Sequence, residues 1–253
     1  MKGVLVCGGK GERLFPLTYS LNKHLLPVYN KPMFYYSLSV LLLAGCRTIF
    51  IVGNKKDFPY FKKYLKKEKI KKCKFFFVEQ KKPDGISSAI KNVLKFFSRD
   101  EKGIFLLGDN FFYGNNLIKI ILSAFKNNNC SIFLSHAIDP WNFGTLVKKK
   151  EKLLFKEKNI NSKKDSVITG LYILDKKSLN YLKFLKKSKR GEYEIIDLIK
   201  LIYEKKKLSV VNLGRGIAWY DMGTFKNINK VSNFVSLIEE RQGLKIGNVN
   251  NVS

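Results

Sequence analysis

Residues 4–13 read VLVCGGKGER, and this stretch decides the predicted fold. Its four apolar residues predict a short buried strand, which runs directly into Gly8, Gly9 and Gly11. Glycine lacks a Cβ atom, so the N–H groups of such a loop can approach phosphate oxygens closely. Arg13 follows, and its guanidinium can bind two of those oxygens at once. A strand that opens into glycines and then presents an arginine suits a triphosphate.

The glycines alone do not identify a nucleotide site. Leu14 stands where the G-x-G-x-x-G pattern requires its third glycine, and the loop does not match the G-x-x-x-x-G-K-[ST] P-loop. A glycine-rich turn between a strand and a helix remains an alternative interpretation. The wider sequence adds LFPLT at 14–18, KHLLPV at 23–28 and KPM at 31–33. Together with the glycine loop, these stretches resemble the signature of the sugar-phosphate nucleotidyltransferases.

The composition bounds the class of protein. The chain has 253 residues, 45% of them hydrophobic, which fits one large α/β domain or two small ones rather than a disordered chain. No apolar run reaches the roughly 18–20 residues of a membrane span, and no signal-peptide pattern precedes the first strand. We therefore expect a cytoplasmic protein without a membrane partner. The scattered cysteines and histidines favour reduced core thiols over a zinc site or a disulfide framework.

The formal net charge of +28 could indicate a protein that binds nucleic acid. Of the 48 basic residues, however, 42 are Lys and only 6 are Arg, and the lysines are spread along the whole chain. Such a distribution is typical of a drift toward A/T-rich codons, and lysine runs such as 148–150 and 205–207 are expected in solvated loops. We expect nonspecific, salt-sensitive attraction to polyanions and no specific nucleic-acid partner.

Strand-length apolar runs alternate with helix-like stretches in the first half of the chain. The predicted strands lie at 4–7, 47–52, 74–78, 103–108 and 131–135, and the predicted helices at 35–43, 58–65, 86–97 and 117–125. This alternation predicts an α/β fold with a mostly parallel sheet flanked by helices. Right-handed crossovers would place the loops that follow the strands at one edge of the sheet, where ligands bind.

The second half of the chain is less regular. The sequence predicts a hairpin from 145–149 and 153–156, strands at 167–174, 208–213 and 217–220, and helices at 194–204 and 225–241. No linker rich in Pro, Gly or Ser and no internal repeat interrupts the chain. A single domain over residues 1–253 is therefore the economical prediction.

Two aspartates are candidates for a metal site. Asp109 directly follows a predicted buried strand in LGDN (107–110), and Asp221 lies in WYDMGT (219–224). Mg²⁺ takes oxygen ligands and often uses only one or two carboxylates together with substrate phosphates. Each aspartate alone could equally be a helix N-cap or a turn residue. Because 112 positions separate them, only the fold can bring them together.

The resemblance runs from Met1 to about Lys245 and is closest to the thymidylyltransferase branch of the family. The matching stretches include GDNFFYG (108–114), RGEYEI (190–195) and IEERQGLK (238–245). It implies a nucleotide-diphospho-sugar transferase fold, which is Rossmann-like, and an Mg²⁺-dependent enzyme. This enzyme would use dTTP and glucose 1-phosphate to make dTDP-glucose and pyrophosphate, for dTDP-rhamnose or other deoxysugar synthesis. The relatives are homotetramers, so a homo-oligomer is expected.

The resemblance also implies a role for each candidate site residue. The implied catalytic residues are Arg13 and Lys23, and the implied metal ligands are Asp109 and Asp221. The implied nucleotide-binding residues are Gly8, Gly9, Gly11, Arg13, Gln80 and Gly85. The implied sugar-phosphate-binding residues are Gly144, Glu157, Lys158, Gly170, Tyr172 and Arg190. Simpler structural roles remain open, namely a surface lysine at Lys23, a surface ion pair at Glu157, a helix cap at Arg190 and core packing at Tyr172.

The implied chemistry needs no general base. The acceptor phosphate is already an anion near neutral pH, since the second pKa of a phosphomonoester is about 6. The obstacle is the repulsion between two polyanions, and bound cations would offset it and stabilise the transition state. The scarcity of histidine is therefore no objection.

The chain departs from the family pattern at several positions. Glu12 stands where Thr is usual, His24 where Gln is common, and Ser88 where Gln normally follows the P-x-G sequence. The family also normally continues well past Lys245, so we expect its C-terminal helical extension to be truncated and feedback inhibition by a dTDP-sugar to be lost. The alternatives are a relative that uses UTP or CTP, a noncatalytic nucleotide-sugar-binding protein, and a polyanion-binding protein.

Overall fold

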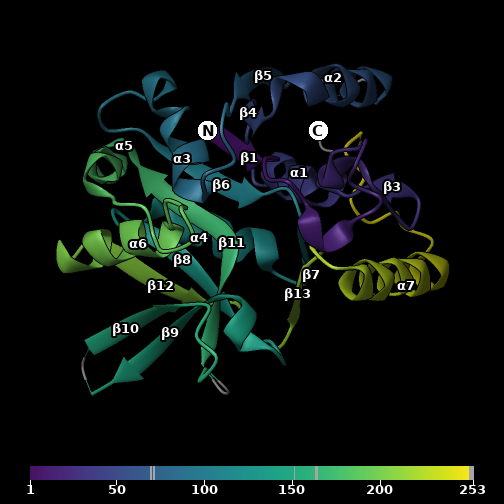
Figure 1. The fold of residues 1–253 in the computed structure, drawn as a ribbon. Coiled ribbons are helices and arrows are strands. Elements are labelled where there is room, and N and C mark those ends of the chain that lie inside the picture. Colours follow the sequence, from purple (N-terminus) through teal and green to yellow (C-terminus); the bar gives the residue numbers. More distant parts are fainter. Residues whose placement is uncertain (69, 71, 151, 163–164, 251–253) are drawn as a thin grey trace.

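The computed structural model describes residues 1–68, 70, 72–150, 152–162 and 165–250. Its central sheet is built from nine strands: β1 (Lys2–Val6), β4 (Thr48–Gly53), β5 (Lys74–Glu79), β6 (Lys102–Leu107), β8 (Cys130–Ser135), β9 (Gly144–Lys149), β10 (Lys152–Glu157), β11 (Ser166–Asp175) and β12 (Leu208–Asn212). Seven of them follow the order β10-β9-β11-β6-β1-β4-β5. In addition, β8 pairs with β11, and β12 pairs with β8 (Figure 1).

The strand directions confirm the predicted fold class. β1 pairs in parallel with β4 and β6, β4 with β5, and β8 with β12. β11 is antiparallel to β6, β8 and β9, and β10 is antiparallel to β9. Since only β10 and β11 run against the other strands, the sheet is mostly parallel, and the chain has an α/β fold.

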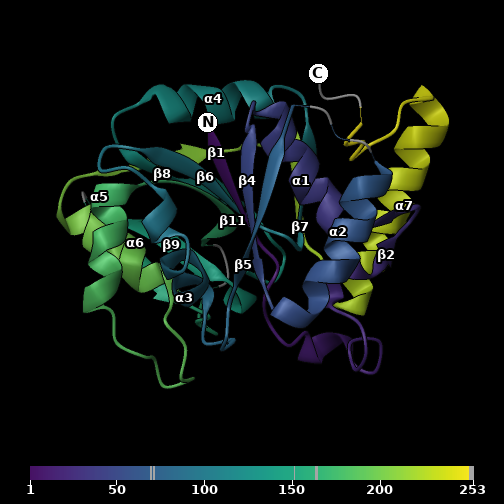
Figure 2. The same ribbon diagram turned by 90° about the horizontal axis from the view of Figure 1, so that it is seen from above.

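Each face of the sheet is covered by its own helices (Figure 2). One cluster packs Leu5 and Ile51 against α1 (Phe34–Leu43), α2 (Phe58–Lys67) and α4 (Leu117–Lys126). The other packs Val4 and Val52 against α3 (Ile86–Lys91), α5 (Lys176–Leu179) and α6 (Ile195–Glu204). Successive side chains of a strand point to opposite faces, so burial of both faces explains why the strands read as continuous apolar runs.

Two small antiparallel ribbons lie outside the main sheet. One pairs β7 (Asn110–Gly114) with β13 (Ile217–Asp221), and the other pairs β2 (Pro27–Val28) with β3 (Lys31–Pro32). The long helix α7 (Phe225–Gln242) packs Val231 and Val235 into a cluster with Phe111 of β7. The β7–β13 ribbon and α7 therefore form one unit beside the sheet (Figure 1).

The structure corrects two predictions about elements. The helix predicted at 86–97 ends at Lys91, and a separate 3-10 turn follows at Leu94–Phe96. This break lets Phe96 stack on Phe50, with ring centroids 4.9 Å apart. Strand β7 was not predicted. The hairpin of β9 and β10, strand β11 and helices α6 and α7 lie where the sequence predicted them, within one or two residues.

The predictions about the cysteines and about membrane spans can also be compared with the structure. All four cysteines are free thiols, and Cys7, Cys46 and Cys130 are buried, as expected for reduced core residues. Within the described ranges, no helix is long and apolar enough to cross a membrane.

Candidate active site

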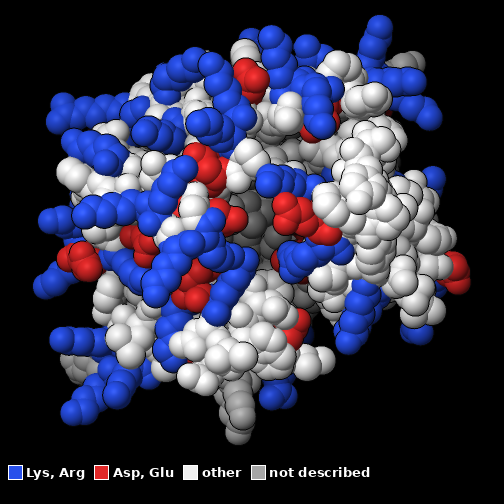
Figure 3. All heavy atoms as spheres, viewed as in Figure 1, with Lys and Arg blue, Asp and Glu red and all other residues white. Residues whose placement is uncertain are grey.

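A cavity of about 270 Å³ opens at the sheet edge where β1 and β6 end. With the exception of Gly11, every residue with an implied role lines it: Gly8, Gly9, Arg13, Lys23, Gln80, Gly85, Asp109, Gly144, Glu157, Lys158, Gly170, Tyr172, Arg190 and Asp221. Gly11 lies in the same loop, where its carbonyl accepts a 2.9 Å hydrogen bond from Thr18 Oγ1. Lys and Arg are spread over this face, whereas many Asp and Glu surround its central hollow (Figure 3).

The β7–β13 ribbon brings the two aspartates together. Asp221 ends β13 and lies opposite Asn110, the first residue of β7. The Met222 N–H donates a 2.8 Å hydrogen bond to the carbonyl of Asp109. The two aspartates therefore occupy neighbouring positions across the ribbon. The Asp109 residue is 7% exposed and the Asp221 side chain 18%, so both carboxylates are largely shielded from water.

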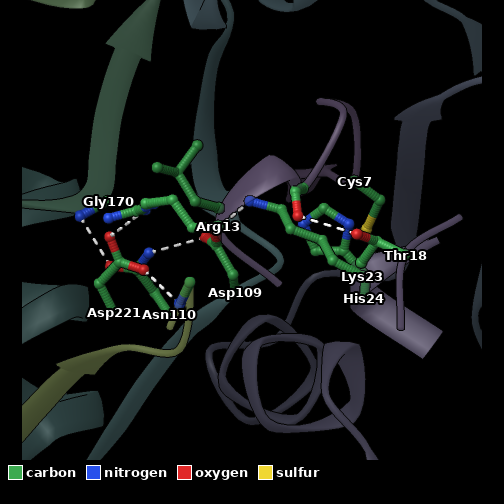
Figure 4. Close-up of polar contacts among 12 residues, drawn as sticks. Cys7, Arg13, Thr18, Lys23, His24, Asp109, Asn110, Gly170 and Asp221 are labelled. Carbon is green, nitrogen blue, oxygen red and sulfur yellow. Dashed lines mark hydrogen bonds and ion pairs between the residues drawn. The ribbon is translucent and has the colours of Figure 1, made fainter. Parts of the chain in front are cut away.

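Each carboxylate has a cation beside it (Figure 4). Lys23 Nζ forms an ion pair with Asp109 Oδ2, and Arg13 Nη2 lies 3.6 Å from Asp221 Oδ2. The Lys23 side chain is only 15% exposed, whereas that of Arg13 is 56% exposed. Lys23 begins a 3-10 turn whose N-cap, Asn22, accepts a hydrogen bond from the backbone N–H of His24. Lys23 is thus a largely shielded charge held in an ion pair, and Arg13 is an accessible one.

The electrostatic environments of the two aspartates differ. Burial favours the neutral form of Asp109, but the charge and hydrogen bond of Lys23 outweigh it and hold the pKa of Asp109 below its usual value. Burial and the negative charge of Asp109 instead raise the pKa of Asp221. The two carboxylates repel each other, so an added cation close to both would be stabilised.

This donor set fits Mg²⁺. The ion prefers oxygen ligands and commonly combines one or two carboxylates with substrate phosphates. Among the described residues, no group of three or more His, Cys, Asp or Glu is arranged to hold a metal. A pair of carboxylates at the wall of an open cavity fits an ion that also binds a substrate better than a closed structural site.

One end of the cavity presents an amide side chain. Gln80 is 7% exposed, and its Nε2 donates a 3.2 Å hydrogen bond to the carbonyl of Gly85. A Cβ atom at Gly8 would lie 2.2 Å from Gln80 Oε1, so any larger residue there would force this amide to shift. His24 also lines the cavity. Burial and the charge of Lys23 lower its pKa to about 3, so this imidazole is neutral and is a poor proton acceptor.

Another part of the cavity carries acidic and basic groups from the β9–β10 hairpin. Glu157 lies opposite Gly144 in the hairpin, and its Oε1 is 3.2 Å from Arg190 Nη2. Burial, followed by the charge of Glu194, raises the pKa of Glu157. Lys158 has a φ of 42°, a conformation that is strained for a residue other than glycine and is common at functional sites.

Tyr172 has both features that the sequence left open, a place in the core and a place in the cavity wall. Its side chain packs in the core beneath the cavity, with only 3% of the residue exposed, and it also lines the cavity wall. Burial raises the pKa of its hydroxyl, so Tyr172 is un-ionised at neutral pH.

Asn110, Trp219 and Glu194 are among the cavity-lining residues that were given no role from the sequence. Asn110 Oδ1 accepts hydrogen bonds from the Trp219 indole N–H at 2.7 Å and from the Gly170 N–H at 3.0 Å. Its Nδ2 donates to Asp109 Oδ1 at 3.1 Å. Glu194 pairs with Arg190 Nη2 at 2.8 Å. A polar residue directly after a buried strand was the available signal for Asn110, but its long-range partners Trp219 and Gly170 could not be identified from spacing.

Comparison with known proteins agrees with this geometry. The family model for nucleotidyl transferases matches residues 2–237. A glucose-1-phosphate thymidylyltransferase from Neisseria meningitidis serogroup A is 36% identical over 249 residues, which span 97% of this chain and 86% of that protein. The resemblance inferred from the motifs is therefore confirmed at the level of the family.

Solved structures give the same result. A candidate glucose-1-phosphate thymidylyltransferase from Bacillus anthracis, crystallised with sucrose, superposes with a TM-score of 0.81 at 29% identity, covering 92% of this chain and 94% of that one. A UDP-glucose pyrophosphorylase in complex with UDP-glucose gives a TM-score of 0.82 at 21% identity, over 95% and 99% of the two chains, and shares the fold. The chain belongs to the nucleotidyl transferase family.

Proposed function

We propose that this protein transfers the thymidylyl group of dTTP to glucose 1-phosphate, forming dTDP-glucose and releasing pyrophosphate. One observation carries the proposal: a single cavity joins the Gly8 loop and Gln80 to Glu157 and Arg190, and includes the pair of aspartates. The Neisseria thymidylyltransferase, which matches 97% of this chain, supports the choice of these two substrates.

The residues of the cavity suit a transfer between two anions. An oxygen of the sugar phosphate attacks the α-phosphorus of dTTP in line, and pyrophosphate leaves. The attacking oxygen needs no proton acceptor, in keeping with a neutral His24. Arg13 and Lys23 would neutralise the triphosphate, and Lys158 and Arg190 the sugar phosphate, so that the two substrates can be aligned.

Asp109 and Asp221 are the proposed ligands of Mg²⁺. When bound, the ion would supply positive charge to the phosphate oxygens. Lys23 keeps Asp109 ionised, because its charge and hydrogen bond offset the burial of the carboxylate. The protein therefore holds one ligand ready in its anionic form before any ion arrives.

Turnover with individual nucleotides tests the proposal. The purified protein is incubated with Mg²⁺, glucose 1-phosphate and each NTP or dNTP in turn, and pyrophosphate release is followed. We expect dTTP to be used fastest, with some use of UTP, because one methyl group is worth only about 1–3 kcal/mol of discrimination. A preference for UTP or CTP would contradict the choice of nucleotide, and no turnover with any of them would contradict the enzymatic role.

Removal of the metal gives a second test. Excess EDTA should abolish turnover, and added Mg²⁺ should restore it. Full activity in EDTA would rule out the metal role of the two aspartates.

We also propose that the chain acts as one domain within a homo-oligomer and supplies dTDP-glucose to deoxysugar synthesis such as that of dTDP-rhamnose. Light scattering coupled to size-exclusion chromatography would show the oligomeric state.

A further inference from the structure

Glu194 is a buried carboxylate in the cavity wall for which the proposed reaction gives no role. Glu194 is 8% exposed, and both of its carboxylate oxygens accept hydrogen bonds from Arg190 Nη2, at 2.8 and 2.9 Å. It is the residue before α6, yet its side chain makes no cap hydrogen bond to that helix. The carboxylate therefore binds Arg190 rather than capping the helix.

Contacts other than Arg190 hold Glu194 in place. Ser188 Oγ donates a 2.7 Å hydrogen bond to Glu194 Oε1. The backbone carbonyl of Glu194 accepts a 3.1 Å hydrogen bond from Ser87 Oγ. A negative charge is also favoured beside the N-terminus of a ten-residue helix such as α6. Ser188 thus holds the carboxylate, and Ser87 the backbone of Glu194, whether or not the guanidinium is bound.

Arg190 is less constrained than Glu194. Its side chain is 37% exposed, and it lies in a turn closed by a 2.8 Å hydrogen bond from the Gly191 N–H to the Ser188 carbonyl. Its partners Glu157, Glu192 and Glu194 are all contacted through Nη2. Among the described residues, no partner contacts Nε or Nη1, so two nitrogens of the guanidinium are available to a phosphate.

The pKa of Arg190 agrees with an ion pair in which Glu194 anchors the guanidinium. Burial alone would lower the pKa of Arg190, but the hydrogen bond and charge of Glu194 raise it on balance. A cation with four rotatable side-chain bonds loses conformational entropy when it is fixed to a phosphate. A fixed carboxylate that already holds the guanidinium removes part of that cost before the substrate binds.

We propose that Glu194 is a positioning residue, which holds Arg190 in the cavity so that its free nitrogens can bind the phosphate of the sugar substrate. This inference rests on the proposed function and adds a residue to it. Glu192 is the natural comparison within the same turn. It also faces Arg190, at 3.6 Å, but its side chain is 42% exposed and a pair of that kind contributes little.

The same segment is joined to the nucleotide end of the cavity. The Tyr193 N–H donates a 2.8 Å hydrogen bond to the Asp84 carbonyl, and the Ser87 N–H donates a 3.3 Å hydrogen bond to the Tyr193 carbonyl. A test of Glu194 must therefore change its charge without displacing the backbone. Glu194→Gln does so, because the amide keeps the size of the side chain and an oxygen that can accept from Ser188.

The experiment compares Glu194→Gln with Glu192→Gln in the full-length protein. We expect Glu194→Gln to raise the KM for glucose 1-phosphate roughly tenfold, the equivalent of one charge-assisted hydrogen bond. The KM for dTTP should stay within about twofold of wild type, and Glu192→Gln should change neither value by more than about twofold. Calorimetric titration with glucose 1-phosphate should show the same loss of affinity as the KM.

An Arg190→Ala background separates positioning from a structural role. If Glu194 acts through Arg190, adding Glu194→Gln to Arg190→Ala should raise the KM for glucose 1-phosphate by less than about twofold. An equal rise in both backgrounds, an equal rise for both substrates, or a lower KM in Glu194→Gln would overturn the proposal. Should Glu194→Gln fail to fold, Ser188→Ala loosens the same carboxylate and should raise only the KM for glucose 1-phosphate. An unchanged KM in that variant would also overturn it.

Failure of this inference is distinct from failure of the proposed function. If the wild-type protein makes dTDP-glucose and Glu194→Gln has wild-type kinetics, only the role of Glu194 is wrong. If the wild-type protein turns over no nucleotide, the proposed function is wrong. Calorimetric titration of the wild type and Glu194→Gln with glucose 1-phosphate then still shows whether Glu194 supports phosphate binding.

Discussion

The indole N–H of Trp219 donates a 2.7 Å hydrogen bond to Oδ1 of Asn110, a residue 109 positions earlier in the chain. This bond joins β13 to β7 directly beside the two aspartates. The same oxygen accepts from the Gly170 N–H, and the Asn110 amide donates to Asp109. Asn110 therefore ties a candidate metal ligand, the antiparallel strand β11 and the ribbon into one buried network, whose partners orient one another.

Trp219→Phe tests this network. The substitution keeps an aromatic ring but removes the donor, so the buried Asn110 oxygen is left with only the Gly170 N–H. We expect a loss of about 1–2 kcal/mol in the free energy of unfolding, measured by urea denaturation. Trp141→Phe is the matched control, because Trp141 is 39% exposed against 9% for Trp219. Equal losses in the two variants would show that the bond to Asn110 contributes nothing.

The two aspartates should respond differently to amidation. Asp221→Asn removes a carboxylate that burial and Asp109 already disfavour in its charged form, so we expect unchanged or increased stability. Asp109→Asn removes the ion-pair partner of the largely shielded Lys23, and we expect a loss of about 3–5 kcal/mol. Both variants should lose at least about 100-fold in turnover if the carboxylates hold Mg²⁺.

Thermal unfolding together with pyrophosphate release checks this contrast. Asp100→Asn is the control, because the Asp100 side chain is 71% exposed and pairs with Lys177 at the surface. It should unfold and turn over like the wild type. Near-normal activity in Asp221→Asn would contradict the proposed metal site, and wild-type stability in Asp109→Asn would contradict the importance of the buried ion pair.

The segment after α7 is held by an ion pair whose contribution should depend on pH. Glu239 accepts from Lys31 Nζ and Asn30 Nδ2 at 2.9 Å and from the Ile246 N–H at 2.8 Å. Burial opposes ionisation, but these hydrogen bonds, led by that from Lys31, lower the pKa of Glu239 below 4.5. The stabilisation is therefore present above about pH 4.5 and is lost as the pH falls through the lowered pKa.

Glu239→Gln should remove this contribution. We expect the variant to be about 1.5–3 kcal/mol less stable than the wild type at pH 7, with the difference shrinking as the pH falls through the lowered pKa of Glu239. Urea denaturation from pH 7 to pH 3 measures it. Glu240→Gln, at the exposed neighbouring position, should differ little from the wild type at pH 7. A difference for Glu239→Gln that stays constant down to pH 3 would exclude the ion pair as its cause.

Much of the fold could be predicted from the sequence because both faces of the sheet are buried. Residues 49–52 and 104–107 are apolar on both faces, so their strand character shows in composition alone. The end of α3 could not be predicted, because the stacking of Phe96 on Phe50 depends on a strand far away in the sequence. Strand β7 was missed for the same reason, since its partner β13 begins about a hundred residues later.

The residues of the candidate site likewise fall into those that motifs could identify and those that only the fold reveals. Motifs identified residues such as Arg13 and Asp109, whose side-chain types point to phosphate or metal chemistry by themselves. The residues that orient them were missed, because Glu194 is recognisable only through its contact with Arg190, and Trp219 only through its bond to Asn110. A sequence pattern records which groups could react, whereas the groups that hold them are defined by contacts that exist only in the fold.

The close approach of Gly85 to Tyr193 links the nucleotide end of the cavity to the turn that carries Arg190. Gly85 has a φ of 109°, and a Cβ atom there would lie 2.5 Å from the carbonyl oxygen of Tyr193 and 2.8 Å from its nitrogen. Both atoms belong to the backbone, so neither can move without displacing the turn. Gly85→Ala should therefore separate the two segments and raise the KM for both substrates, by about tenfold or more.

Gly191→Ala isolates the contribution of backbone strain from that of the clash. Gly191 has a φ of 76°, which is also unfavourable for alanine, but its Cβ would meet no atom within 4 Å. It should lose about 1–2 kcal/mol of stability from strain alone. Its KM values for dTTP and glucose 1-phosphate should stay close to wild type. If Gly85→Ala behaved no differently from Gly191→Ala in kinetics, the contact between the two segments would not couple the two ends of the cavity, because both variants carry the strain and only one carries the clash.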